Sequence, residues 1–166
     1  MIRRFASALA LAASIVVASA ASVGATTVPQ AFDHVKATTA GDSLYVSFVE
    51  RGLEPGQNYA YTGSGTLRET FQCYRTSTFT PLPKKRSVAG TASPDPRAYQ
   101  ANTNGVIRGF TYLDSGIAWP DFCGVRQEVV PVRVCYAPYD LVDFVEPFDV
   151  FYFPDGTKIC GAIEPD

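Results

Sequence analysis

Four cysteines are the residues of this chain with the widest range of possible chemistry: Cys73, Cys123, Cys135 and Cys160. A cysteine acts as a nucleophile only as a thiolate that a histidine or another positive group activates. The closest two, Cys123 and Cys135, are twelve positions apart. The chain therefore lacks a C-x-x-C redox motif and the paired short spacings of zinc sites. An even cysteine count in an exported chain is typical of disulfides. We interpret all four as structural and expect no metal or other cofactor.

A single histidine, His34, stands beside Asp33 in the segment QAFDHVKA. Residues that are adjacent in the chain do not normally orient each other as a base and its partner. One histidine is too few for a His-rich zinc site, and the chain has no G-x-S-x-G motif of a serine hydrolase. We interpret His34 as an exposed or capping residue near the mature N-terminus.

Acidic residues recur at three-residue intervals late in the chain and could supply carboxylate chemistry. They are Asp140, Asp143, Glu146 and Asp149, with Asp155 beyond them. A pair of carboxylates could hydrolyse a glycosidic bond, and a cluster could bind calcium. The EF-hand pattern is absent, and on a strand residues three apart point to opposite faces. We interpret these residues as a solvated edge that discourages aggregation. A secreted, glycosidase-like hydrolase using carboxylates near 140–155 remains the alternative function.

Aromatic residues in expected loops are the candidate binding surface: Trp119, Phe122 and Tyr99. Exposed aromatic rings are common where proteins bind partners. The segment IAWPDFCG, which ends beside Cys123, is the best candidate for a contact site. The competing interpretation is that Trp119 covers one end of the core.

The first residues have the properties of a secretory signal peptide, which we assign to residues 1–25. Arg3 and Arg4 precede an apolar run and then small residues. The apolar run is shorter than the roughly 20 residues of a membrane span. Cleavage after Ala25 is favoured, and cleavage after Ala20 is the alternative. The brevity of the segment is typical of bacteria. We therefore expect a secreted protein, extracellular or periplasmic, with no membrane span after signal removal.

The mature chain, residues 26–166, has the length of one domain. Its 12 Lys and Arg face 16 Asp and Glu, a net charge of −4, which gives no general attraction to nucleic acid. The basic run Lys84, Lys85 and Arg86 could contact an acidic polymer, but three charges in an acidic chain do not make a nucleic-acid signature. We interpret the run as a solvated loop.

Short alternating segments and frequent turn residues predict an all-β fold. The expected strands are 43–50, 66–75, 86–92, a segment that follows an Asn-Gly turn at 104–105 and ends at 113, then 126–137, 140–153 and 157–163. Residues 63–66 are expected to form a turn, and residues 76–105 to form long loops around one short strand. Pro131 indicates an edge or a bulge in its strand. The pattern predicts an antiparallel immunoglobulin-like β-sandwich of about seven to eight strands, stapled by disulfides.

Alternation also bears on the disulfide pairing, for which four cysteines allow three arrangements. Cys73 shares an inward face with Leu67 and Phe71, whereas Cys135 shares a face with Pro131 and Arg133. This difference disfavours a Cys73–Cys135 bridge. Cys135–Cys160 could staple the last strand to the sheet, and Cys73–Cys123 would then anchor the loop WPDFCG.

Several segments in order resemble short secreted bacterial β-sandwich proteins of uncharacterised function. The segments are DSLYVSFVERGLEPGQNYAY, FQCYR, a Pro-rich loop, NTNGVIRGFTYL, a cysteine loop and VRVCYAPYDLVD, which together cover most of residues 43–143. The resemblance implies an immunoglobulin-like sandwich and a Cys73–Cys123 bridge. Cys135 and Cys160 are additional to that pattern. It implies no activity, substrate or catalytic residue.

The function expected from these features is that of a non-catalytic exported module rather than an enzyme. It would be a monomer that binds an unknown protein or glycan ligand, or that has a structural role in the cell envelope or outside the cell. A redox or metal protein built on the four cysteines is a third possibility. Fold class does not decide among these functions, because one sandwich can host many of them.

Overall fold

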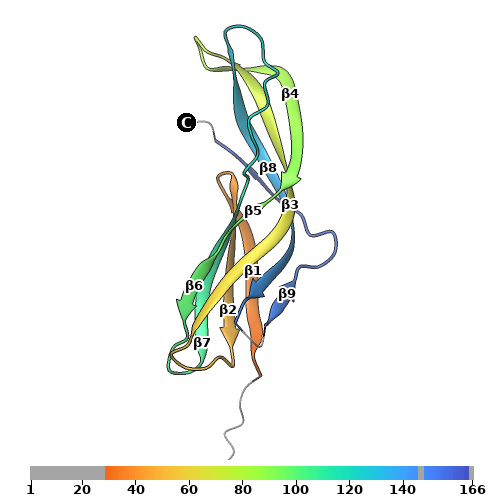
Figure 1. Cartoon of the computed structure of the whole chain (residues 1–166). Coiled ribbons are helices and arrows are strands. Elements are labelled where there is room, and N and C mark those ends of the chain that lie inside the picture. Colours follow the sequence, from red (N-terminus) through yellow and green to blue (C-terminus); the bar gives the residue numbers. More distant parts are fainter. Residues whose placement is uncertain (1–28, 146–147, 165–166) are drawn as a thin grey trace, which may run out of the picture.

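The computed structural model describes residues 29–145 and 148–164, and this part of the chain is entirely β-structure and irregular connections (Figure 1). The signal peptide expected at residues 1–25 lies outside the described residues. In order, the strands are β1 (Ala31–Ala40), β2 (Ser43–Arg51), β3 (Asn58–Arg75), β4 (Thr80–Thr91), β5 (Ser93–Asp95), β6 (Arg97–Gln100), β7 (Val106–Asp114), β8 (Gln127–Asp143), β9 (Val150–Tyr152) and β10 (Ile159–Ala162).

The strands form two sheets that share one hydrophobic core. One sheet has the order β1-β2-β7-β5, and the other has the order β10-β8-β3-β4, with β6 beside β3 and β9 beside β8. Every pairing between these strands is antiparallel. Inward side chains of both sheets belong to the same cluster of buried residues. The expected all-β antiparallel fold is therefore confirmed, with its layers packed face to face.

Strand β2 illustrates how the sequence directs this packing. Its residues alternate between buried and partly exposed, so that Leu44, Val46 and Phe48 face the core as the pattern predicts. The Phe48 ring lies 4.3 Å from the ring of Tyr61 on the opposite sheet. Burial of each such side chain stabilises the fold by about 1.5–3 kcal/mol.

Strands β3 and β8 run the length of the molecule and pair with each other over most of it. At its upper end, the β3–β4–β8 sheet extends beyond the other sheet (Figure 1). The turn expected at residues 63–66 is wrong, because Gly63 and Gly65 lie inside β3. A Cβ on Gly65 would lie 2.8 Å from the carbonyl oxygen of Ala137. Glycine here allows the two long strands to approach closely at a bulge.

Residues 76–105 also differ from the prediction of long loops. They contain β4, β5 and β6, and the basic run 84–86 lies on strand β4. Pro81 and Pro83 are compatible with β4 because it is an edge strand that pairs only with β3. Proline is tolerated at an edge, where its missing N–H faces solvent.

The strands expected at 126–137 and 140–153 are also divided differently. Residues 127–143 form the single strand β8, and only Val150–Tyr152 forms a second one. Tyr139 is the extra residue of a bulge that joins the two parts of β8. A second register shift lies beside Pro131, as its sequence indicated. Each bulge reverses which residues face inward, so alternation across β8 does not continue unbroken.

Candidate functional site

The two disulfides join the cysteine pairs that were expected to anchor the loop WPDFCG and to attach the last strand to the sheet. Cys73 and Cys123 are bonded with Cα atoms 5.7 Å apart, and Cys135 is bonded to Cys160. The chain therefore holds no free thiol. Cys73 is fully buried on the inward face of β3. It is a structural residue, and a thiol nucleophile is ruled out in this oxidised form.

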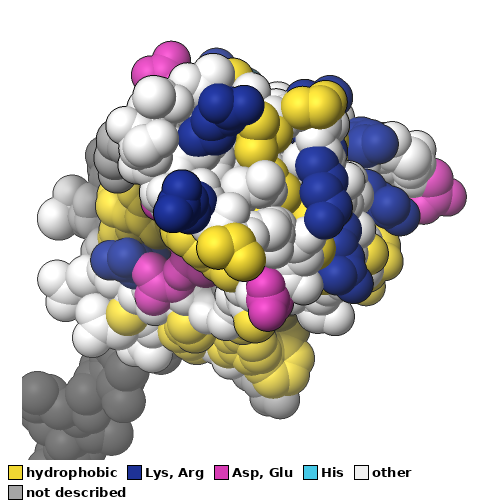
Figure 2. Space-filling model, turned by 90° about the horizontal axis from the view of Figure 1, so that it is seen from above, with side chains coloured by type: hydrophobic (Ala, Val, Ile, Leu, Met, Phe, Trp, Pro, Cys, Tyr) yellow, Lys and Arg dark blue, Asp and Glu magenta, His cyan; other side chains and the backbone are white. Residues whose placement is uncertain are grey.

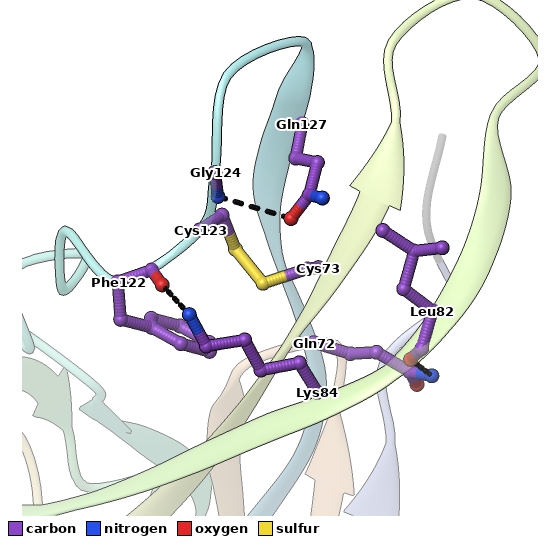
Figure 3. Close-up of a disulfide and its surroundings, with 8 residues drawn as sticks. All are labelled: Gln72, Cys73, Leu82, Lys84, Phe122, Cys123, Gly124 and Gln127. Carbon is purple, nitrogen blue, oxygen red and sulfur yellow. Dashed lines mark hydrogen bonds between the residues drawn. A yellow bond between two sulfur atoms is a disulfide. The ribbon is translucent and has the colours of Figure 1, made fainter.

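The Cys73–Cys123 bridge fixes the segment between β7 and β8 against the extended end of the sheet (Figure 3). The ammonium group of Lys84, on β4, donates a hydrogen bond to the carbonyl oxygen of Phe122 and lies 5.7 Å from the centre of its ring. The N–H of Gly124 donates to Gln127 Oε1 at 3.0 Å. Lys84 thus contributes to holding the loop and is not simply solvated.

The start of the same segment is tied to a buried carboxylate. Ser115 donates a hydrogen bond from its hydroxyl to Glu69 on β3, and both residues are buried. Burial raises the pKa of Glu69, and the hydrogen bond from Ser115 opposes that rise. An inward glutamate on an apolar face is thereby satisfied by the loop that covers it.

Trp119 projects from this anchored segment and is 65% exposed. It lines a hollow of about 280 Å³ together with residues of the hairpin tip, β8 and the C-terminal segment: Phe79, Glu128, Val129, Val130, Pro131, Ile163 and Glu164. We call this the Trp119 hollow. It offers apolar surface with two carboxylates, a combination suited to binding a partly apolar ligand.

Phe79 brings a second exposed ring to the Trp119 hollow from the tip of the β3–β4 hairpin. Its ring lies 4.9 Å from that of Tyr74, and its backbone has φ of 47°. A bulky residue in the left-handed region is uncommon and costs about 1–3 kcal/mol. The N–H of Phe79 donates to the carbonyl oxygen of Arg75 at 2.8 Å, and this bond helps to hold the strained turn.

The other proposed contact residues lie in different surroundings. Phe122 is half-buried beside Lys84, in the same segment as Trp119. Tyr99 lies on β6 opposite Tyr59, whereas Cys73 pairs with Val129. Fourteen positions of β3 separate those two places, roughly 45 Å along a strand. Tyr99 is half-buried there, and its hydroxyl donates to the carbonyl oxygen of Phe110 at 2.8 Å. The structure therefore does not bring Tyr99 together with Trp119.

The predicted row of carboxylates is dispersed. Asp140 is on β8, Asp155 is in the turn after β9, and Glu146 lies outside the described residues. Asp149 accepts the N–H of Phe32 at 3.0 Å. Asp143 differs from the solvated edge that we expected, because it is fully buried.

Glu50, at the end of β2, forms a buried pair with Asp143 that the sequence did not reveal. One amide hydrogen donor, Gln30 Nε2, lies 3.0 Å from Glu50 Oε1 and 3.1 Å from Asp143 Oδ2. Glu50 and Asp143 are both fully buried. Glu50 Oε2 and the Tyr61 hydroxyl are buried without a hydrogen bond of good geometry. The alternation of β2 places Glu50 on the core face, and this alternation is the one sequence feature that could have indicated a buried carboxylate here.

Burial raises the pKa of Glu50 to about 7, and the negative charge of Asp143 adds to the rise. Burial also raises the pKa of Asp143. When two neighbouring carboxyl groups share one amide donor, the state in which at least one of them is protonated is favoured. Their raised pKa values suit acid–base chemistry, but both side chains are fully buried.

The adjacent pair Asp33 and His34, the other candidate for acid–base chemistry, is exposed, and Asp33 binds Arg51. His34 Nε2 lies 3.7 Å from Asp33 Oδ2, and the His34 side chain is 80% exposed. The same Asp33 oxygen accepts a hydrogen bond from Arg51 Nε at 2.8 Å, which lowers the pKa of Asp33. The exposed position of His34 is confirmed, although it lies within strand β1, which the sequence did not predict.

Residues 29–145 and 148–164 contain no cluster of His, Cys, Asp and Glu that could hold a metal ion. That part of the chain also contains no helix long and apolar enough to cross a membrane. Comparisons with protein-family models, with curated proteins and with solved structures found no match.

Proposed function

We propose that this protein is a non-catalytic exported module that binds a protein or glycan ligand through the Trp119 hollow. The observation that carries the proposal is the exposure of Trp119 and Phe79 around a hollow whose frame is fixed by the Cys73–Cys123 disulfide. A rigid frame reduces the ordering that binding must bring about. Two disulfides are typical of an oxidising compartment, which supports a role in a bacterial envelope or outside the cell.

The proposal extends to the finer class of the fold, an immunoglobulin-like sandwich. In that class four strands in the order A-B-E-D face a sheet with the order G-F-C. The orders β1-β2-β7-β5 and β10-β8-β3-β4 correspond to A-B-E-D and G-F-C-C′. Strands β6 and β9 would be short additions. Neither disulfide joins the B and F strands, as the bridge of antibody domains does.

The alternative, a secreted hydrolase, draws support from the Glu50–Asp143 pair alone. Its acids have raised pKa values, as a catalytic acid requires. Both are shielded from solvent in this conformation. A hydrolase would lose activity on Glu50→Gln and keep it on Trp119→Ala, whereas a binding module shows no hydrolysis to lose.

The test of the binding proposal is isothermal titration calorimetry against a panel of neutral oligosaccharides and neutral peptides. Trp119→Ala and Phe79→Ala should each weaken binding of any ligand found by at least about tenfold, the loss expected of central aromatic contacts. Phe144→Ala is the matched control, because Phe144 is an aromatic residue that is 53% exposed outside the hollow. Equal losses from all three variants, or none from the first two, would contradict the proposal.

A further inference from the structure

A second surface with binding character lies on the solvent face of the β3–β8 sheet, where small side chains leave a hollow of about 400 Å³. Thr66, Ala89 and Ala137 come from three neighbouring strands and form its floor. Arg68 and Lys158 line the same hollow. A shallow depression flanked by cations is suited to an anionic ligand.

A third cation stands next to this hollow. Arg68 pairs with Cys135 across β3 and β8, and Arg133 is two positions further along β8. Such diagonal neighbours have Cα atoms roughly 7–8 Å apart. Figure 2, which views the molecule from above, shows Lys and Arg side chains gathered in a row on one side of the upper face.

Within residues 29–145 and 148–164, none of these three cations has a salt-bridge partner. The three ion pairs among the described residues involve none of Arg68, Arg133 and Lys158. Like charges placed close together on one face are unfavourable unless an opposite charge lies between them. In a chain with an excess of acidic residues, leaving these three unpaired keeps their donors free for an external anion.

Exposed tyrosines continue the surface beyond the cations. A second hollow of about 370 Å³ shares Ala137 with the first and is lined by Tyr139 and Tyr152. These rings are 56% and 72% exposed. The Tyr139 hydroxyl lies 3.4 Å from Thr66 Oγ1, in the floor of the first hollow. Asp155 stands at the second hollow as a hydrogen-bond acceptor.

We propose that this face binds an acidic polysaccharide. Its carboxylate or sulfate groups pair with Arg68, Arg133 and Lys158, and a neighbouring sugar ring packs on Tyr139. Charge complementarity selects the anion, and the adjoining tyrosines and Asp155 select a hydroxyl-bearing ring rather than an anion alone. The face is distinct from the Trp119 hollow, because no residue lines both.

The experiment measures binding of the intact, oxidised protein to polygalacturonate and to heparin, with dextran as the neutral glycan. Duplex DNA and vesicles of anionic phospholipid serve as anions that are not glycans. The double variant Arg68→Gln/Arg133→Gln should bind both acidic glycans about tenfold less tightly, a loss of about threefold for each charged contact. Tyr139→Ala should also weaken both. The matched control, Lys36→Gln/Arg108→Gln, removes the same charge from exposed residues of the other sheet and should bind like the wild type.

Several results would overturn the proposal. One is no binding to either acidic glycan, and another is an equal loss in the control variant. Tighter binding to DNA or to vesicles than to the glycans would show a surface that reads charge alone. The Trp119→Ala variant separates this proposal from the preceding one, since it should bind the acidic glycans normally.

Discussion

Replacement of Glu50 by glutamine should make the protein more stable at neutral and alkaline pH, although it removes a charged hydrogen-bond acceptor. Burial raises the pKa of Glu50 from 4.5 to about 7. The folded protein therefore keeps a proton that the unfolded chain releases near pH 4.5. Between these two values the folded state binds more protons, so the free energy of unfolding falls as the pH rises and levels off above about 7.

The size of this fall follows from the difference in pKa. Each pH unit of difference corresponds to about 1.4 kcal/mol, so Glu50 should cost the wild type as much as about 3 kcal/mol above pH 7. Glutamine carries no charge at any pH and keeps an oxygen for the Gln30 amide. Asp143, whose pKa is also raised, should leave a fall of the same sign in the variant.

The assay is urea unfolding followed by circular dichroism at pH 5 and pH 8, with both disulfides intact. The wild type should lose stability between these pH values, and Glu50→Gln should lose clearly less. Glu54→Gln is the matched control, because Glu54 is exposed and only four positions away. Equal falls in the wild type and Glu50→Gln would refute the reasoning, as would a wild type that is more stable at pH 8.

Three further variants test the frame of the fold and the role of its exposed tryptophan by urea unfolding. Replacement of Cys73 and Cys123 by serine should cost about 4 kcal/mol, since the bridge closes a loop of 50 residues. Gly65→Ala should cost about 1–3 kcal/mol, because its Cβ would lie 2.8 Å from the backbone of Ala137. Trp119→Ala should change stability by no more than about 0.5 kcal/mol, as expected of an exposed side chain.

Each of these variants has a control with a different expected result. Serine at Cys135 and Cys160 should cost less, about 3.5 kcal/mol, because that loop spans 25 residues. Gly124→Ala brings its Cβ no closer than 3.4 Å to a flexible side chain and should be nearly neutral. Leu44→Ala, in the core, should cost about 2–5 kcal/mol. Three results would contradict the corresponding arguments. They are a Cys135/Cys160 variant that loses as much stability as the Cys73/Cys123 variant, a Gly124→Ala variant that loses as much as Gly65→Ala, and a Leu44→Ala variant that loses no more than Trp119→Ala.

Local alternation was sufficient to predict the parts of the fold in which a strand has one buried and one exposed face. Leu44, Val46 and Phe48 in β2 and the inward position of Cys73 in β3 followed from it. The inward position of Cys73 also disfavoured the bridge to Cys135, in agreement with the disulfides observed. These inferences need only the two-residue period of a strand.

The segments that were predicted wrongly are stabilised by partners distant in the sequence. Gly63 and Gly65 were predicted to form a turn. They instead pair with β8, whose backbone approaches so closely that a side chain would not fit without displacing it. The prolines of β4 read as loop, but the strand needs hydrogen bonds on one side only. Such effects depend on which strand is the neighbour, and alternation within one segment carries no information about that.

The candidate sites show the same limit. Trp119 was identified because an aromatic residue beside an anchoring cysteine is a local pattern. The Glu50–Asp143 pair joins residues 93 positions apart, and the three-residue spacing around Asp143 instead suggested a solvated edge. The cations of the proposed glycan-binding face are Arg68 on β3, Arg133 on β8 and Lys158 directly before β10. Only the strand register brings these three residues together.

The most direct test of the account uses the emission of Trp119 during titration with a ligand found by calorimetry. Trp119 is the only tryptophan in the chain, so its emission reports on the Trp119 hollow alone. A ligand that covers the 65% exposed side chain should shift the emission to shorter wavelength and protect it from acrylamide quenching. Saturating ligand that leaves the emission and the quenching unchanged would contradict the claim that this hollow is the binding site.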